Sequence, residues 1–258
     1  MYPDNILPGI DLYLIMLCAG VAAAIIIFRV ISDKIGLSAK LLNFSLITGA
    51  FSIGAGYYSA VFFQALYNIP SRGKFEITSD TGATFYGGLI GGAACFLLVY
   101  FAVGHFVFRD KENVKCFFTI ADIASASIAA AHSLGRVGCF FAGCCHGAET
   151  DGFFGIYMPA VGKSVVPLQI YEALFLAGLF IFLAWRAVRG KTFNLAIYMS
   201  SYGVWRFLVE FLRDDYRGET FVPFLSPSQL TAVFMIIGSG ILVLLQKKLS
   251  GKKEKSGD

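Results

Sequence analysis

Charged side chains placed inside or at the ends of apolar segments are the first candidates for chemistry in this sequence. Arg206, Glu210 and Arg213 are spaced i, i+4 and i+7, which predicts that all three lie on one face of a helix. Arg136 ends another apolar segment, and His132 precedes it by four residues on the same face. Guanidinium groups bind phosphate through paired hydrogen bonds, which favours a site for a lipid phosphate. The alternative is an Arg–Glu network that only ties two helices together.

Residues 135–147 form a segment rich in glycine and cysteine, with the sequence GRVGCFFAGCCHG. Four glycines in thirteen positions predict a tight re-entrant loop whose backbone amides can approach an anion. Cys139, Cys144 and Cys145, with His146 beside them, allow three interpretations: packing or a disulfide, a reactive thiolate, or a metal site. The spacing C-x4-C-C-H lacks the paired C-x2-C arms of a standard zinc site, so a metal ion is the least expected of the three.

Two further segments place polar residues at the start of apolar stretches. Residues 85–92 carry two glycine pairs after Tyr86, which predicts close helix packing with the tyrosine as an interfacial anchor. Residues 167–172 end in Glu172, and a carboxylate in the first turn of a helix is stabilised by the positive end of the helix dipole. A purely structural role can therefore explain the polar residues of both segments.

The composition shows what kind of protein must position these residues. The chain has 258 residues, of which 57% are hydrophobic and 15% are charged, and its mean hydropathy is +0.69. A soluble domain carries about 25% charged residues and about 45–50% apolar residues. The excess of apolar residues is too large for one buried core. This excludes a soluble globular enzyme, a disordered chain and a nucleic-acid-binding protein, and it indicates an integral membrane protein.

Seven apolar segments, each with at most one charged residue, predict the membrane-spanning elements. A helix needs about 18–20 apolar residues to cross the hydrocarbon core, and only the sixth segment is clearly too short. It reaches spanning length if the helix continues through Arg206 and Glu210 to about Leu212. We therefore predict an all-α polytopic membrane protein with about seven transmembrane helices. The segments are 12–28, 41–67, 81–108, 116–135, 167–185, 193–205 and 226–245.

Lysine and arginine between these segments predict the orientation. They concentrate on alternate loops, and basic residues favour the cytoplasmic side. The amino terminus is thus expected outside and the carboxyl terminus in the cytoplasm. Positive charge follows the first segment instead of preceding it, so we do not interpret that segment as a cleaved signal peptide. We expect a transmembrane bundle over residues 1–246, with a small external cap at about 136–166, and a basic cytoplasmic tail at 247–258.

Four motifs occur in order along the chain: FYGGLIG at 85–91, GRVG at 135–138, QIYE at 169–172 and YGVWRFLVEFLR at 202–213. Together they resemble the bacterial prolipoprotein diacylglyceryl transferase family, over roughly residues 13–229. The last motif is the most specific, because it sets six residues, Tyr, Gly, Arg, Phe, Glu and Arg, at fixed offsets. The family also has a seven-helix bundle with its amino terminus outside.

The resemblance implies a defined reaction. Such an enzyme transfers the sn-1,2-diacylglyceryl group of phosphatidylglycerol to the lipobox cysteine thiol of a preprolipoprotein, forming a thioether and releasing glycerol phosphate. The resemblance implies a multi-pass protein of the bacterial cytoplasmic (inner) membrane. It implies no metal and no organic cofactor, and no nucleic acid is expected as a partner.

The resemblance also assigns roles by matching positions. Arg136 and Arg206 would hold the lipid phosphate, and Glu210 would orient Arg206. Arg213 would extend the basic wall. For Tyr86, which stands where the family has a histidine, our own hypothesis is a hydrogen bond to the acceptor or the lipid. If the reaction needs a base, His132 is the candidate. The other positions expected to line the substrate site are Tyr13, Gly87, Gly88, Gly138, Cys139, Gln169, Tyr171, Glu172 and Tyr202.

The chain departs from the family pattern at several positions, which places it in a divergent, cysteine-containing branch. Tyr86 stands where the family has a histidine, Gly56 where it has an arginine, and Cys139 where it has an asparagine. This leaves two alternative functions open. In one, Cys139, Cys144 or Cys145 carries out a different lipid or acyl transfer or a thiol exchange. In the other, the protein binds lipid without catalysis.

Overall fold

A computed structural model describes residues 11–213, 222 and 224–255 of the chain. Residues 1–10 of the expected bundle and 256–258 of the expected tail lie outside this part. The chain divides into two compact units, one comprising Met1–Ile35 with Ala121–Asp258 and the other Gly36–Ile120. Each unit is described by itself.

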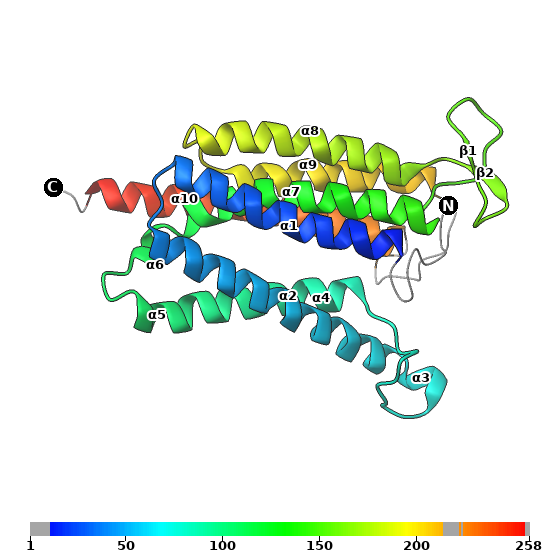
Figure 1. The fold of residues 1–258 in the computed structure, drawn as a ribbon, viewed down its shortest axis with the longest axis horizontal. Coiled ribbons are helices and arrows are strands. Elements are labelled where there is room, and N and C mark those ends of the chain that lie inside the picture. Colours follow the sequence, from blue (N-terminus) through cyan, green and yellow to red (C-terminus); the bar gives the residue numbers. More distant parts are fainter. Residues whose placement is uncertain (1–10, 214–221, 223, 256–258) are drawn as a thin grey trace. The chain divides into compact units, whose positions relative to one another are not determined.

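The described residues are mostly helical, with one short antiparallel hairpin (Figure 1). The first unit contains α1 (Leu12–Lys34), most of α7 (Phe117–Ala142), β1 (Ile156–Met158), β2 (Lys163–Val165), α8 (Leu168–Val188), α9 (Asn194–Val209), the 3-10 helix η2 (Glu210–Leu212) and α10 (Pro227–Lys255). The second unit contains α2 (Ala39–Tyr67), α3 (Ile69–Arg72), α4 (Phe85–Leu98), the π-helical segment η1 (Val99–Val103), α5 (Gly104–Val107) and α6 (Glu112–Lys115).

Six helical stretches of the described residues are long and apolar enough to cross a membrane, as expected for a polytopic membrane protein. The predicted extension of the sixth apolar segment is also found, because α9 is followed directly by η2, which ends at Leu212. The 16 residues of α9 alone fall short of a span. The count of seven therefore stays a prediction.

Small residues set the distances between helices in the first unit. A Cβ atom on Gly20 of α1 would lie 3.0 Å from the carbonyl oxygen of Ala131 in α7. A Cβ atom on Gly203 of α9 would lie 3.0 Å from the carbonyl oxygen of Ala232 in α10. Glycines at such contacts let helix backbones approach closely, which is how helices associate where water gives no driving force. Of the 18 residues that form the most apolar part of each helix, 44% are buried in α7 and 17% in α1. The helix α7 is therefore the more enclosed of the two.

The prediction of a re-entrant loop at 135–147 is wrong for its first half, because α7 continues to Ala142. Gly138 lies in this helix, where a Cβ atom would come within 3.2 Å of Tyr13 and Met16 in α1, so this glycine serves packing. The helix ends at Ala142, and Gly143 follows it with φ 72°. The Gly143 amide bonds to the Phe140 carbonyl at 3.1 Å and the Cys144 amide to the Cys139 carbonyl at 3.1 Å. These two bonds form a Schellman motif that stops the helix.

The segment after α7 contacts η2 and the first residues of α8. In its hairpin, Tyr157 of β1 lies opposite Ser164 of β2. The Gly147 amide donates to the Val166 carbonyl at 2.8 Å, and the Ala148 amide donates to the Leu212 carbonyl at 2.9 Å. Residues 136–142 of the expected cap are helical and belong to α7, and the hairpin follows them. That this segment forms an external cap stays a prediction.

In the second unit, the glycine pairs of residues 85–92 lie against α2, as predicted for close packing. A Cβ atom on Gly56 would lie 3.0 Å from the carbonyl oxygen of Gly88 and 3.3 Å from the Cα atom of Gly92. The Ser59 hydroxyl donates to the Gly87 carbonyl at 2.8 Å, which joins the two helices by a hydrogen bond. The packing therefore leaves no room for a large side chain at Gly56.

Asp122 joins three helices of the first unit. Its carboxylate accepts hydrogen bonds from the amides of Phe193 and Leu195 at the start of α9, each at 3.1 Å. It also accepts one from the Gln246 amide group of α10 at 3.2 Å. The side chain therefore satisfies backbone donors that a helix start leaves unpaired.

Replacing Asp122 by alanine should lower the free energy of unfolding by about 1–3 kcal/mol, because buried amides lose their acceptor. The measurement is unfolding of the purified protein by titration with a denaturing detergent. Asp33→Ala is the control, since the Asp33 side chain is 60% exposed and its nearest basic partner is 3.8 Å away. Equal stability of the two variants would contradict the anchoring role of Asp122.

Candidate functional site

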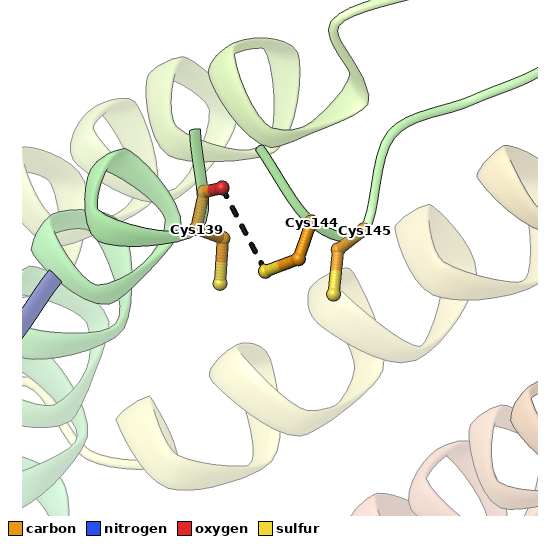
Figure 2. Close-up of side chains that lie close together, drawn as sticks. All are labelled: Cys139, Cys144 and Cys145. Carbon is orange, nitrogen blue, oxygen red and sulfur yellow. Dashed lines mark hydrogen bonds between the residues drawn. The ribbon is translucent and has the colours of Figure 1, made fainter. Parts of the chain in front are cut away.

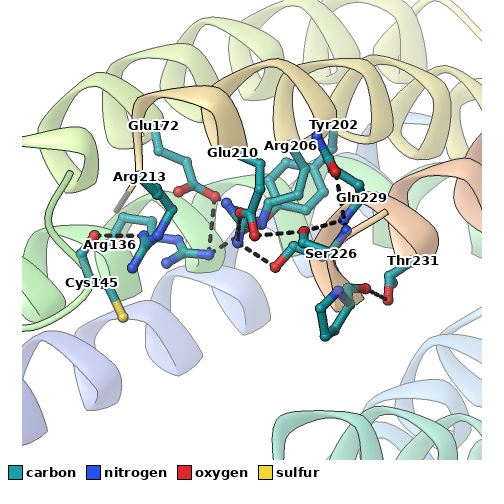
Figure 3. A network of polar contacts seen from close by, with 12 residues as sticks. Arg136, Cys145, Glu172, Tyr202, Arg206, Glu210, Arg213, Ser226, Gln229 and Thr231 are labelled. Atoms are coloured by element: carbon teal, nitrogen blue, oxygen red, sulfur yellow. Dashed lines mark hydrogen bonds and ion pairs between the residues drawn. The ribbon is translucent and has the colours of Figure 1, made fainter. Parts of the chain in front are cut away.

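A buried carboxylate lies where α7, α8 and α9 meet (Figure 3). Glu172 of α8 is 3% exposed. Its Oε1 atom is 3.0 Å from a guanidinium nitrogen of Arg136 and accepts a hydrogen bond from the Tyr202 hydroxyl at 2.7 Å. Arg136 also donates to the Tyr202 hydroxyl at 3.2 Å. A buried charge is costly unless it is paired and hydrogen-bonded, and this triangle provides both.

His132 lies on the same face of α7 as Arg136, as predicted from their spacing. Its Nε2 atom is 4.0 Å from Oε1 of Glu172, and its Nδ1 atom is 3.1 Å from the Tyr198 hydroxyl. Its ring packs edge-on against Tyr202, with 4.7 Å between ring centroids. The imidazole is therefore held in one orientation beside a carboxylate.

Arg206 and Glu210 form the second ion pair of the site, with a nitrogen–oxygen distance of 2.8 Å, as the i, i+4 spacing predicts. Arg206 is only 9% exposed and donates to the Ser228 hydroxyl of α10 at 2.7 Å. The Ser226 hydroxyl donates to Oε1 of Glu210 at 2.7 Å. The pair is thus braced by the first residues of α10.

The sequence analysis did not single out Ser226 or Ser228, although a signal for them exists. Ser226 and Gln229 exchange two hydrogen bonds, from the Gln229 amide to the Ser226 hydroxyl at 3.2 Å and from the Ser226 amide to Oε1 of Gln229 at 3.1 Å. This S-x-x-Q arrangement is a capping box, and Pro227 occupies the first helical position. The sequence SPSQ therefore marks the start of α10 and the residues that brace Glu210.

Arg213 departs from the prediction that it shares a helical face with Arg206 and Glu210. The α-helix ends at Val209, η2 has the tighter 3-10 winding, and Arg213 follows with an extended backbone at ψ 149°. The i+7 spacing of an α-helix therefore does not apply to it. Its guanidinium instead donates to the Cys145 carbonyl at 2.9 Å (Figure 3).

Two Arg–Glu ion pairs form the centre of the cluster, Arg136 with Glu172 and Arg206 with Glu210. Arg213 lies beside them and donates to the Cys145 carbonyl. Among the described residues, the buried Nε atom of Arg136 has no hydrogen-bond partner, so one donor is available. An unused guanidinium donor suits an anionic oxygen, such as that of a phosphodiester.

Three cysteines converge next to this cluster, at the end of α7. The Sγ atoms of Cys139, Cys144 and Cys145 all lie within 4.8 Å of one another, and the three form no disulfide in the described structure (Figure 2). The Cys139 and Cys144 thiols, and then the charges of Arg136 and Arg213, lower the pKa of the Cys145 thiol. Because the three cysteines are free thiols, the structure does not support the disulfide interpretation.

The other predicted site residues are distributed around the cluster. Gln169 is fully buried and donates to the Cys144 carbonyl, so it holds the cysteine segment. The Tyr171 hydroxyl donates to the Phe154 carbonyl at 3.1 Å, which anchors the segment before β1. His146 places Nδ1 at 2.9 Å from the Gly147 carbonyl oxygen and is not part of the thiol cluster. Tyr13 packs on Gly138.

Tyr86, Gly87 and Gly88 belong to the other unit, at the start of α4. Within that unit Gly87 and Gly88 lie against α2. Their part in the site stays a prediction.

Comparison with known proteins gives one consistent result. A family model described as "Prolipoprotein diacylglyceryl transferase" matches residues 6–245. A Clostridium perfringens protein named phosphatidylglycerol–prolipoprotein diacylglyceryl transferase 2 is 35% identical over 94% of this chain and 93% of its own length. A Clostridium tetani protein named phosphatidylglycerol–prolipoprotein diacylglyceryl transferase is 33% identical over 86% of this chain and 87% of its own length. A Geobacter sulfurreducens protein of the same name is 29% identical over 93% of this chain and 92% of its own length.

Breaking the buried pair should be costly. Glu172→Gln leaves the Arg136 guanidinium uncompensated, so the free energy of unfolding should fall by about 3–5 kcal/mol. Combining it with Arg136→Gln removes the orphaned charge, and the double variant should lose less stability than the sum of the single variants. Denaturing-detergent titration measures all three.

The control for this cycle is Glu76→Gln, since the Glu76 side chain is 32% exposed and its loss should cost about 1 kcal/mol at most. Strict additivity of the Glu172 and Arg136 substitutions would show that the two side chains do not depend on each other.

Proposed function

Because the chain belongs to the prolipoprotein diacylglyceryl transferase family, we propose that its arginine cluster binds the phosphate of phosphatidylglycerol. The protein is a transferase of lipoprotein biosynthesis. It transfers the sn-1,2-diacylglyceryl group of phosphatidylglycerol to a cysteine thiol of a prolipoprotein. The carbon–oxygen bond to phosphate breaks, a thioether forms, the thiol proton is released, and glycerol phosphate leaves.

The observation that carries this proposal is an unused guanidinium donor in the cluster. The buried Nε atom of Arg136 has no hydrogen-bond partner among the described residues. The phosphodiester of phosphatidylglycerol carries a single negative charge and two unesterified oxygens. One of these oxygens would accept the unused hydrogen bond from Arg136.

The same contacts account for catalysis. As the diacylglyceryl carbon leaves, the phosphate changes from a monoanion to a dianion, so its need for positive charge grows toward the transition state. Donors that are already held in place stabilise such charge without reorganising. Glu172 and Tyr202 hold Arg136, while Glu210 and Ser228 hold Arg206.

The acceptor thiol must lose its proton, and we assign this step to His132. Its Nε2 atom lies 4.0 Å from Oε1 of Glu172 and its Nδ1 atom lies 3.1 Å from the Tyr198 hydroxyl, so the imidazole is held in one orientation for proton uptake. Tyr86 is assigned a hydrogen bond to the acceptor or the lipid, since a neutral phenol with an ordinary pKa of about 10 is a poor base.

Several finer features belong to the same proposal. We assign the acceptor as a lipobox cysteine, and the location as the bacterial inner membrane with the amino terminus outside and the carboxyl terminus in the cytoplasm. The helix α9 with η2 is proposed as the seventh span. The bundle over 1–246, the cap at about 136–166 and the basic tail at 247–258 remain the proposed organisation. Relatives named as transferases disfavour the alternative reactions by loop thiols and a purely lipid-binding role.

Transfer of labelled diacylglycerol from phosphatidylglycerol to a lipobox peptide tests the function directly. The purified protein should catalyse it, and Arg136→Ala and Arg206→Ala should each lose about 100-fold or more in rate, because each removes a donor to the leaving phosphate. Arg206→Lys keeps the charge but lacks the paired donors, and an intermediate loss is expected.

Arg29→Ala is the matched control, since the Arg29 side chain is 64% exposed on α1, and it should keep full activity. A wild-type protein that binds phosphatidylglycerol but transfers nothing would refute the reaction. Unchanged rates in both alanine variants would refute the arginine assignment alone.

The role of His132 is tested separately. His132→Gln should reduce the transfer rate by about 100-fold and flatten the acidic side of the pH–rate profile, because no side chain then takes up the proton. His105→Gln, at an exposed position of α5, should leave the rate and the profile unchanged. Full activity of His132→Gln would remove the assignment.

A further inference from the structure

The cysteine segment has a geometry that the proposed transfer reaction does not use. Cys139 lies in the last turn of α7, and Cys144 and Cys145 follow the helix end. The three sulfur atoms lie within 4.8 Å of one another, and Figure 2 shows the side chains converging. The Cys144 thiol faces the Cys139 carbonyl, with 3.7 Å between sulfur and oxygen.

The backbone is shaped to bring these thiols together. Neighbouring side chains in an extended chain point to opposite sides, so adjacent cysteines would normally diverge. Here Cys145 has φ 61°, a left-handed conformation that is uncommon for a residue other than glycine. Gly143 has φ 72° and turns the chain back after α7. Both turns are needed to place Cys144 and Cys145 on the side of Cys139.

Side chains from other elements hold this backbone in place. Gln169 of α8 donates to the Cys144 carbonyl, and the Gln169 side chain is fully buried. Arg213, beyond η2, donates to the Cys145 carbonyl at 2.9 Å. The positions of Cys144 and Cys145 are thus fixed by contacts that do not involve their sulfur atoms.

We propose that Cys139, Cys144 and Cys145 form a binding site for a thiophilic metal ion, with Zn²⁺ as the best-fitting ion. Zinc binds thiolate sulfur at about 2.3 Å, which places sulfur ligands about 3.8 Å apart in a tetrahedral site. The cluster, with separations up to 4.8 Å, needs only a small contraction. Three protein ligands leave a fourth position for water.

The charge of the surroundings fits this site. Each thiol that ligates the metal loses its proton, so three thiolates with one divalent ion carry a net charge of −1. The Arg213 guanidinium, which donates to the Cys145 carbonyl, places a cation next to this anionic site. The ion would also tie the end of α7 to the segment that Arg213 holds. It has no part in the transfer step.

The test uses the full-length purified protein, reduced and stripped of metal with a chelator. Titration with Co²⁺, which reports thiolate ligands by charge-transfer absorption, should saturate at one ion per chain, and Zn²⁺ should abolish the absorption. Cys139→Ser and Cys145→Ser should each weaken Co²⁺ binding at least about tenfold. Cys18→Ser, on α1, and Cys95→Ser, on α4, are matched controls that should bind like the wild type.

Three results would overturn the site. The first is that one equivalent of Co²⁺ gives no thiolate charge-transfer absorption. The second is that Cys145→Ser binds Co²⁺ as tightly as the wild type. The third is that the unreduced protein contains a disulfide within the triad and that the same protein binds no Co²⁺ after reduction. Because binding is measured without lipid or peptide, failure here leaves the transfer reaction untouched. Retained binding in a protein without transfer activity would likewise support the site alone.

Discussion

A charge in an apolar environment must be paired, and the first unit is organised around that constraint. The Glu172 carboxylate is buried in α8, and it is tolerated because α7 brings Arg136 and α9 brings Tyr202 to the same oxygen atom. Moving any of the three helices would break a contact that hydrocarbon cannot replace. The packing of α7, α8 and α9 therefore depends on one ion pair and the hydroxyl bound to it.

The sequence was informative where the physics is local. Hydropathy located the six long apolar helices, and the i, i+4 rule found Arg206 with Glu210. Sequence-based prediction failed where contacts join distant segments, since nothing near Glu172 in the sequence indicates Arg136 as its partner. Glycine content misled at the end of α7, because glycine both breaks helices and lets them pack, and only the neighbouring helix decides which applies.

The departures from the family pattern are structurally coherent. Gly56, where the family has an arginine, lies against Gly88 and Gly92, so α2 and α4 gain a close backbone contact where a long side chain would not fit. Cys139, where the family has an asparagine, joins a cluster of thiols at the end of α7. The arginines and glutamates of the two ion pairs lie in the motifs that carry the resemblance. The departures thus concern the surroundings of these pairs and leave the pairs themselves intact.

The length of α7 sets the distance between Arg136 in the candidate site and Asp122, which joins α7 to α9 and α10. Asp122 and Arg136 are both on this helix, which rises about 1.5 Å per residue, so they are about 21 Å apart along its axis. The hydrocarbon core is about 30 Å thick. As a membrane span, α7 cannot place Asp122 and Arg136 at the two surfaces of the core at the same time, because their separation is smaller than its thickness. Water is scarce within the core, so such charges need partners inside the protein, and both side chains have them.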